Sequence, residues 1–368
     1  MSDSVARFSP PTRDSSTASP DADEAARVPY RAPVWLPGGH AQTLYAALLA
    51  PCPRLRFTRS RWETPDGDFV DLDWVKQDSG FGIQDPELET RDPELETWNS
   101  ELETQAPLVV LFHGLEGGSR SHYACALMAA LAARGWRGVV PHFRGCSGEV
   151  NRLPRAYHSG DSAEIDWIVR RLKDRYPATP VYAVGVSLGG NALLKWLGES
   201  GASARGVVDR AVSVSAPLDL MIAGDALGRG FNLVYARYFL RTMKKKSLMK
   251  LDRFPGLYDA ARVHAASTLR EFDDVVTAPL HDFANTDDYW TRASAKPWLR
   301  HIAVRTLLVN ARDDPFLPAC ALPQPHEVSS SVVCDFPGTG GHAGFVSGAF
   351  PGHLRWLPRR VLGFFDAL

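Results

Sequence analysis

The chain has 368 residues, of which 45% are hydrophobic and 23% are charged, a composition typical of a globular protein and not of a disordered or fibrous one. A formal net charge of −1 gives no overall attraction to nucleic acid, and no apolar run approaches the about 18 residues that a membrane-spanning helix needs. Five scattered cysteines without a Cys-x-x-Cys pair favour reduced thiols in a cytoplasmic protein over a disulfide framework.

The N-terminal segment, residues 1–28, is polar and rich in Ser, Thr, Pro, Asp and Ala. It lacks the basic-then-apolar order of a secretory signal, and we expect a disordered tail there. Residues 29–368 are expected to form one α/β domain. Its first elements are predicted to be a β-hairpin, because residues 55–62 and 69–75 alternate in polarity around a Pro-Asp-Gly turn.

Residues 82–105 form an acidic insertion in which a seven-residue unit occurs three times. A heptad period invites a coiled-coil interpretation, but each unit has only one aliphatic residue and two of the units contain proline. We therefore predict a tandem duplication inside a surface loop, without a chemical role.

The next element is a fully apolar strand at residues 108–112, which runs into His113-Gly114-Leu115. A strand followed by His-Gly supplies one oxyanion donor in certain hydrolases, namely the backbone N–H of the next residue, here Leu115. We expect His113 itself to hold the loop and not to act as a base. A helix at 123–133 and a strand at 138–140 follow.

Residues 161–172 are predicted to be a helix with Asp161 as its N-cap and Glu164 completing a capping box. The apolar strand 181–186 then enters Gly-x-Ser-x-Gly at 185–189, the pattern of a nucleophile elbow with Ser187 at its apex. The glycines are needed because a side chain at either position would clash in so tight a turn. The N–H of Leu188 is the second expected oxyanion donor, and a helix is predicted at 192–197.

After a strand at 207–214 the strand signal stops, and residues 215–299 are predicted to form a helical cap over the site. Within it, residues 235–246 are basic and amphipathic. We expect a solvated helix there, with contact to an anionic lipid surface as the alternative that is not favoured.

Two further strands, 305–309 and 332–336, each end next to a candidate acid–base residue. The first is followed by adjacent carboxylates at Asp313 and Asp314, of which Asp314 is preferred because it begins the Asp-Pro turn. The second is followed by His342 in a glycine-rich loop. An imidazole there can take the proton of Ser187 and return it to the leaving group, while the acid orients the ring.

Apolar strands that alternate with helices predict a mostly parallel, eight-stranded sheet with helices on both faces and an inserted helical cap. No cluster of His or Cys has metal-ligand spacing, and no phosphate-binding Gly-x-x-x-x-Gly-Lys loop is present. The sequence pattern therefore indicates neither a metal site nor a phosphate-binding loop.

Several motifs together resemble the YheT-type branch of the α/β-hydrolase superfamily, the AB hydrolase 4 family of esterases and lipases. The likeness spans roughly residues 33–365 and rests on the segments 37–43, 112–117, 143–148, 157–161, 186–191, 313–316 and 341–345. The resemblance implies a triad of Ser187, Asp314 and His342 that cleaves carboxylic esters of acyl chains without a cofactor. The tail and the heptad repeat depart from the family pattern.

The sequence therefore predicts a cytoplasmic serine esterase that acts on small acyl esters, with short or medium chains or acylglycerol-like, through an acyl-enzyme on Ser187. A thioesterase, an amidase or an acyltransferase with the same triad is the alternative, because leaving-group choice depends on the cap. A non-catalytic binding protein of the same fold is less favoured, since no triad member is missing.

Overall fold

A computed structural model describes residues 29–76 and 106–367. The predicted N-terminal tail and the predicted repeat loop lie outside these residues. No helix in the described part of the chain is both long and apolar enough to cross a lipid bilayer.

One eight-stranded sheet forms the centre of the molecule, with the strand order β1-β2-β4-β3-β5-β6-β7-β8. The strands β1 and β2 form an antiparallel hairpin, β2 also pairs antiparallel with β4, and all other neighbours are parallel. The predicted mostly parallel sheet is therefore confirmed. The strands are β1 (Phe57–Glu63), β2 (Phe69–Val75), β3 (Leu108–Phe112), β4 (Arg137–Pro141), β5 (Val181–Val186), β6 (Arg210–Val214), β7 (Arg305–Val309) and β8 (Val332–Asp335).

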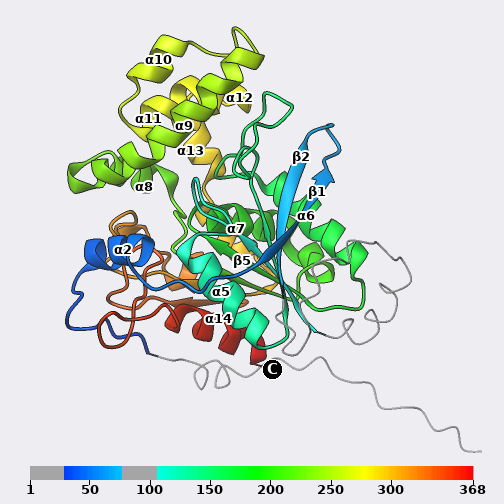
Figure 1. Ribbon diagram of the computed structural model, residues 1–368, viewed down its shortest axis with the longest axis vertical. Coiled ribbons are helices and arrows are strands. Elements are labelled where there is room, and N and C mark those ends of the chain that lie inside the picture. Colours follow the sequence, from blue (N-terminus) through cyan, green and yellow to red (C-terminus); the bar gives the residue numbers. More distant parts are fainter. Residues whose placement is uncertain (1–28, 77–105, 368) are drawn as a thin grey trace, which may run out of the picture.

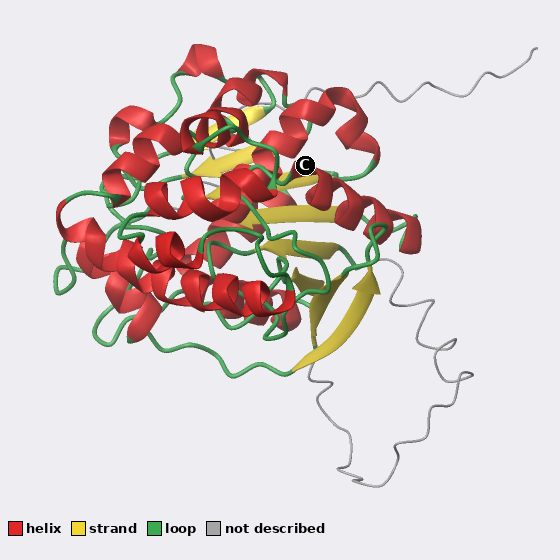
Figure 2. Ribbon diagram, turned by 90° about the horizontal axis from the view of Figure 1, so that it is seen from above, coloured by secondary structure: helices red, strands yellow, loops and turns green. Residues whose placement is uncertain are grey.

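Helices cover both faces of the sheet, because successive side chains of its buried strands point to opposite sides. In β3, Val110 packs into the core shared with helices α6 (Ser162–Arg175) and α7 (Leu188–Ser200). Its neighbour Val109 packs into the core shared with α5 (His122–Ala133) and α14 (Trp356–Asp366). Figure 1 shows α5 and α14 side by side, and Figure 2 shows the strands lying among helices.

The remaining helices flank these layers or connect the strands. The helix α2 (Gly39–Leu48) precedes the hairpin and was not predicted from the sequence; neither was α14. Short 3-10 turns connect the later elements: η1 (Gly201–Gly206), η4 (Lys296–His301), η5 (Ala319–Ala321) and η6 (Pro325–Glu327).

Between β6 and β7 the chain makes a helical insertion, the residues that the sequence predicted as a helical cap. Figure 1 shows it gathered at the end of the molecule opposite α5 and α14. A core of its own, with Leu240, Val263 and Phe272 buried, holds it together. Its elements are α8 (Leu220–Leu227), η2 (Gly230–Asn232), α9 (Leu233–Arg253), α10 (Ala260–Ala265), α11 (Leu269–Phe272), the π-helix η3 (Asp273–Thr277), α12 (Ala278–Leu280) and α13 (Thr286–Ala293).

The predicted capping box of α6 is wrong, although the helix begins where expected. The Asp161 carboxylate makes no cap hydrogen bond and pairs instead with Arg155, whose Nη2 is 2.5 Å from Oδ1 of Asp161. Glu164 pairs with Arg144, with 2.6 Å between Oε2 and Nε. Both carboxylates are buried, and a buried charge is stabilised more by a guanidinium than by a backbone N–H.

Candidate active site

Ser187 lies on the turn between β5 and α7, in a backbone conformation that side chains rarely adopt. Its φ is 54° and its ψ is −122°, and it is the residue directly before the first turn of α7. Its N–H donates to the carbonyl of Val214 at the end of β6, which ties the turn to the sheet. Such strain persists only where the surroundings enforce it, and it is common at functional sites.

The glycines around Ser187 are required by close backbone approach, as the sequence predicted. A Cβ at Gly185 would lie 2.5 Å from the carbonyl oxygen of Gly189. A Cβ at Gly189 would lie 2.3 Å from the carbonyl oxygen of Phe112 on the neighbouring strand. Real Cβ atoms do not approach so closely, so α7 can pack against the strand ends only with glycine at these positions.

The structure brings the three predicted side chains into one hydrogen-bonded row. Nε2 of His342 lies 2.9 Å from Oγ of Ser187, and Nδ1 of His342 lies 2.9 Å and 3.2 Å from the two carboxylate oxygens of Asp314. The Asp314 side chain is fully buried and also accepts from the N–H of Phe316, 2.9 Å away. These distances allow one proton to move between Ser187 and the imidazole while Asp314 fixes the ring.

The neighbouring carboxylate, Asp313, has a different partner. Its Oδ1 accepts from the N–H of Gly341, 2.9 Å away, at the start of the loop that carries His342. Burial raises the pKa of Asp313, and the charge of Asp314 raises it further. Asp313 therefore contacts the His342 loop and Asp314 contacts the imidazole itself.

The helix α2 holds the His342 loop in place, which sequence reasoning missed. The N–H of His342 donates to Oγ1 of Thr43, 2.9 Å away, and the N–H of Val346 donates to the side-chain oxygen of Gln42 at the same distance. On the other side of the loop, the N–H of Ala343 donates to Oγ of Ser215 after β6. Gln42 and Thr43 lie in the segment 37–43, which is part of the family resemblance, but the sequence pattern gave no sign of a partner about 300 positions away.

The backbone N–H groups of Leu115 and Leu188 have no acceptor among the hydrogen bonds of the described residues. Leu188 begins α7, where the first N–H groups of a helix have no partner within it. Leu115 follows Gly114, at which a Cβ would lie 3.0 Å from Cβ of Ser187. Both leucines line the same cavity as Ser187. The two predicted oxyanion donors are thus free and close to Ser187.

His113 has partners on both ring nitrogens. Its Nδ1 lies 2.8 Å from the carbonyl oxygen of Gly114, and its Nε2 accepts from the N–H of Phe143. Burial lowers the pKa of His113 to about 3, so the ring is neutral near pH 7. These contacts agree with the prediction that His113 holds the loop.

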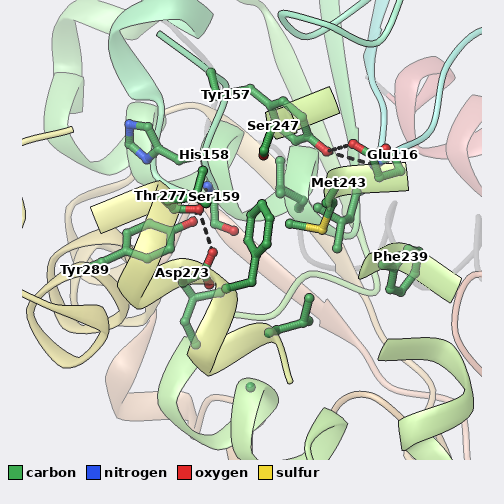
Figure 3. Close-up of a pocket in the computed structure, with 18 of the residues that line it drawn as sticks. Glu116, Tyr157, His158, Ser159, Phe239, Met243, Ser247, Asp273, Thr277 and Tyr289 are labelled. Atoms are coloured by element: carbon green, nitrogen blue, oxygen red, sulfur yellow. Dashed lines mark hydrogen bonds between the residues drawn. The ribbon is translucent and has the colours of Figure 1, made fainter. Parts of the chain in front are cut away.

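The loop after β3 is also fixed from the side of the helical insertion. Glu116, which has a φ of 56°, lies with its carboxylate 2.8 Å from Nζ of Lys246 on α9 and 2.8 Å from the hydroxyl of Tyr157. The same hydroxyl accepts from the N–H of Glu116 (Figure 3). Lys246 therefore links the helical insertion to the loop that carries Leu115, a contact that the sequence gave no means of predicting.

A cavity of about 150 Å³ extends from Ser187 into the helical insertion. Figure 3 shows Phe239 and Met243 of α9 on one side of it and Asp273, Thr277 and Tyr289 on another. Most of its wall is apolar, with further side chains from Leu220, Leu227, Leu269, Phe272, Val276, Leu280 and Phe316. Such a surface suits an apolar ligand that reaches Ser187.

Residues from other segments that carry the family resemblance, 37–43, 143–148 and 157–161, lie beside the site. The Nδ1 atom of His40 lies 3.0 Å from the hydroxyl of Tyr235 on α9, and His158 lines the cavity wall. The thiol of Cys146 is partly buried, and desolvation raises its pKa to about 12. Among the described residues, no group of three His, Cys, Asp or Glu side chains is arranged to hold a metal ion.

Residues 107–349 match the family model described as alpha/beta hydrolase fold. The Escherichia coli K12 protein named "Putative esterase YheT" is 38% identical over 88% of this chain and 88% of its own length. Human "Phospholipase ABHD3" is 28% identical over 92% of this chain and 79% of its own length. "Monoacylglycerol lipase" of Saccharomyces cerevisiae is 28% identical over 65% of this chain and 55% of its own length. The solved structure of an esterase from Pyrococcus furiosus has a TM-score of 0.50 at 13% identity, covering 87% of this chain and 97% of that one.

Proposed function

The chain belongs to the alpha/beta hydrolase fold family, in its YheT-type branch of ester hydrolases, and we propose that it cleaves carboxylic esters through an acyl-enzyme on Ser187. The observation that carries this proposal is the 2.9 Å contact between Oγ of Ser187 and Nε2 of His342. Asp314 lies on the opposite side of the imidazole, and an apolar cavity opens at the serine. The arrangement matches what a nucleophile, a base and an orienting acid require.

In the first half of the reaction, Nε2 of His342 takes the hydroxyl proton while Oγ of Ser187 forms a bond to the ester carbonyl carbon. The carbonyl oxygen becomes an oxyanion that accepts hydrogen bonds from the N–H groups of Leu115 and Leu188. Asp314 keeps the second imidazole proton on Nδ1 and stabilises the imidazolium. The tetrahedral intermediate then collapses, the C–O bond to the alcohol breaks, and His342 returns the proton to the leaving alcohol.

In the second half, water takes the place of the alcohol. His342 removes a proton from the water, the hydroxide adds to the acyl carbon, and the same two N–H groups stabilise the second oxyanion. The bond between the acyl carbon and Oγ of Ser187 then breaks, His342 returns its proton to Oγ, and the carboxylic acid leaves. No step uses a metal or an organic cofactor.

We propose short or medium acyl esters or acylglycerol-like esters as substrates. The apolar side chains that line the cavity support an acyl chain as ligand. The names of two relatives, a phospholipase and a monoacylglycerol lipase, point to acyl esters of glycerol. We also propose a cytoplasmic location, which is supported by the scattered positions of the five cysteines and by the lack of a Cys-x-x-Cys pair in the sequence.

A panel of p-nitrophenyl esters of graded acyl length tests the function. The parent should hydrolyse the panel with a maximum in kcat/KM at the length that fills the cavity. Ser187→Ala should lower kcat by at least about 10⁴-fold, because the nucleophile acts together with its base. The exposed Ser203→Ala variant is the matched control and should keep the parent rate. Equal hydrolysis by Ser187→Ala and the parent would refute the proposal.

A further inference from the structure

The helix α9 has one face toward the cavity and another toward solvent. Phe239, Met243 and Lys246 line the cavity. The opposite face, together with the preceding turn η2, exposes large apolar side chains: Phe231 is 53% exposed, Val234 48% and Tyr238 66%. The sequence alone favoured a solvated helix here, because it does not show which side chains the rest of the protein leaves uncovered.

Basic side chains lie between these apolar ones. Arg237, Arg241 and Lys245 are all exposed on the same face. Residues 231–251 contain no Asp or Glu, and no carboxylate of the described residues pairs with these three cations. The docking face, defined as Phe231, Val234, Arg237, Tyr238, Arg241 and Lys245, therefore combines exposed apolar area with uncompensated positive charge.

The docking face lies directly behind the candidate active site. Tyr235, on the buried side of the same helix turn, contacts the ring of Phe316 with centroids 4.7 Å apart. The Phe316 ring in turn lies 4.1 Å from that of His342. Phe231 also contacts His40 of α2, with centroids 4.8 Å apart. A surface that covers this face would thus lie one helix away from His342 and Ser187.

We propose that the docking face rests on an anionic lipid bilayer. Aromatic side chains such as Phe231 and Tyr238 suit the boundary between headgroups and acyl chains, while Arg and Lys pair with lipid phosphates. The three cations have no carboxylate partner among the described residues, so they attract a negatively charged surface and gain little from a neutral one. Acyl substrates that leave the bilayer would meet a cavity whose wall is the other face of the same helix.

Co-sedimentation with vesicles tests the docking face without any enzyme assay. The full chain should pellet with vesicles of phosphatidylcholine containing phosphatidylglycerol, bind far less to pure phosphatidylcholine, and dissociate as salt is raised. The triple variant Arg237→Gln, Arg241→Gln, Lys245→Gln should lower the apparent partition coefficient by about a hundredfold, as three surface charges contribute. A matched triple, Arg54→Gln, Arg56→Gln, Arg300→Gln, removes the same charge from exposed positions elsewhere and should bind like the parent.

A second variant tests the contribution of the apolar side chains of the docking face to vesicle binding. The double variant Phe231→Ser, Tyr238→Ser keeps all the charges and should also weaken vesicle binding, with an unchanged far-ultraviolet spectrum as proof of folding. Ser187→Ala should bind vesicles as the parent does, so a failure of the proposed chemistry and a failure of docking are separate results. The proposal would be overturned if the parent did not bind anionic vesicles. It would also be overturned if the two triple variants, with charges removed from the docking face or from elsewhere, lost vesicle binding equally.

Discussion

At the scale of single residues, the site separates two adjacent carboxylates by their partners. Asp314 contacts the imidazole of His342, and Asp313 accepts from the backbone N–H of Gly341. The sequence placed both at the end of a strand and preferred Asp314 on its turn pattern. Only the fold shows which carboxylate reaches the ring, because that depends on how the loop after β8 packs against the one after β7.

The first prediction concerns these two carboxylates. Asp314→Asn should lower kcat by about 10⁴-fold, because an amide favours the wrong imidazole tautomer while leaving the geometry intact. Asp313→Asn is the matched control. It should lower kcat by less than about tenfold, because the amide oxygen can still accept a hydrogen bond from the N–H of Gly341. Steady-state kinetics with one p-nitrophenyl ester measures both. If Asp313→Asn lowered kcat more than Asp314→Asn does, Asp313 would be the carboxylate that orients the imidazole.

The second prediction concerns Asp273, which lines the cavity and is buried on the π-helix η3. Its carboxylate accepts from the Thr277 hydroxyl, 2.6 Å away, and from Nε1 of Trp290, 2.9 Å away. No cation contacts it among the described residues, and burial raises its pKa to about 6. The folded pKa lies above that of the unfolded chain, so the contribution of Asp273 to stability is complete at low pH and falls as pH rises through 6.

Asp273→Asn removes this titration, so the stability of the variant relative to the parent should increase between pH 4 and pH 7.5, by on the order of 3 kcal/mol. The exposed Asp252→Asn variant should show no such trend. Thermal unfolding across this pH range measures the difference. A difference between variant and parent that stays constant with pH would show that Asp273 titrates normally.

At the scale of elements, the site depends on contacts between segments far apart in the chain. The sequence predicted the turn around Ser187 and the loop of His342, because each follows a predicted strand and has glycines at tight positions. It did not predict that Thr43 of α2 supports His342, since no local pattern encodes a contact across 299 positions. The capping box at Asp161 and Glu164 was wrong for a different reason: their carboxylates pair with Arg155 and Arg144, and the capping rule considers only the backbone of the helix end.

The third prediction tests the support from α2. Thr43→Val removes the acceptor of the His342 N–H and should lower kcat by about ten- to a hundredfold, because small displacements of a base are costly to the rate. KM should change little, since Thr43 does not line the cavity. Thr58→Val, on an exposed position of β1, is the control. A change confined to thermal stability, with kcat unaltered, would mean that Thr43 does not position His342.

At the scale of the whole molecule, the sheet and the helical insertion have separate cores. The strands pack between two helical layers, whereas the insertion buries a smaller cluster around Leu240, Val263 and Phe272. Lys246 and Glu116 connect the two across the cavity. Elements with fewer buried contacts open at lower free energy, so we expect the insertion to open before the sheet.

The fourth prediction follows from this separation. In native-state hydrogen exchange, peptides from residues 220–293 should exchange at a lower free energy than peptides from β3 and β5. Val263→Ala should lower protection in the insertion only, by the loss of buried methyl groups. Val212→Ala, equally buried in β6, should lower protection in the sheet. If both variants lowered protection uniformly, the molecule would unfold as one unit.

The measurement that tests the central claim most directly is the trapping of the acyl-enzyme. Rapid acid quenching during hydrolysis of a p-nitrophenyl ester, followed by peptide mass spectrometry, should locate one acyl group on Ser187. A fluorophosphonate should label the same residue, and its label should prevent acylation. An acyl group on another residue, or full hydrolytic activity in protein whose Ser187 is labelled, would contradict the account.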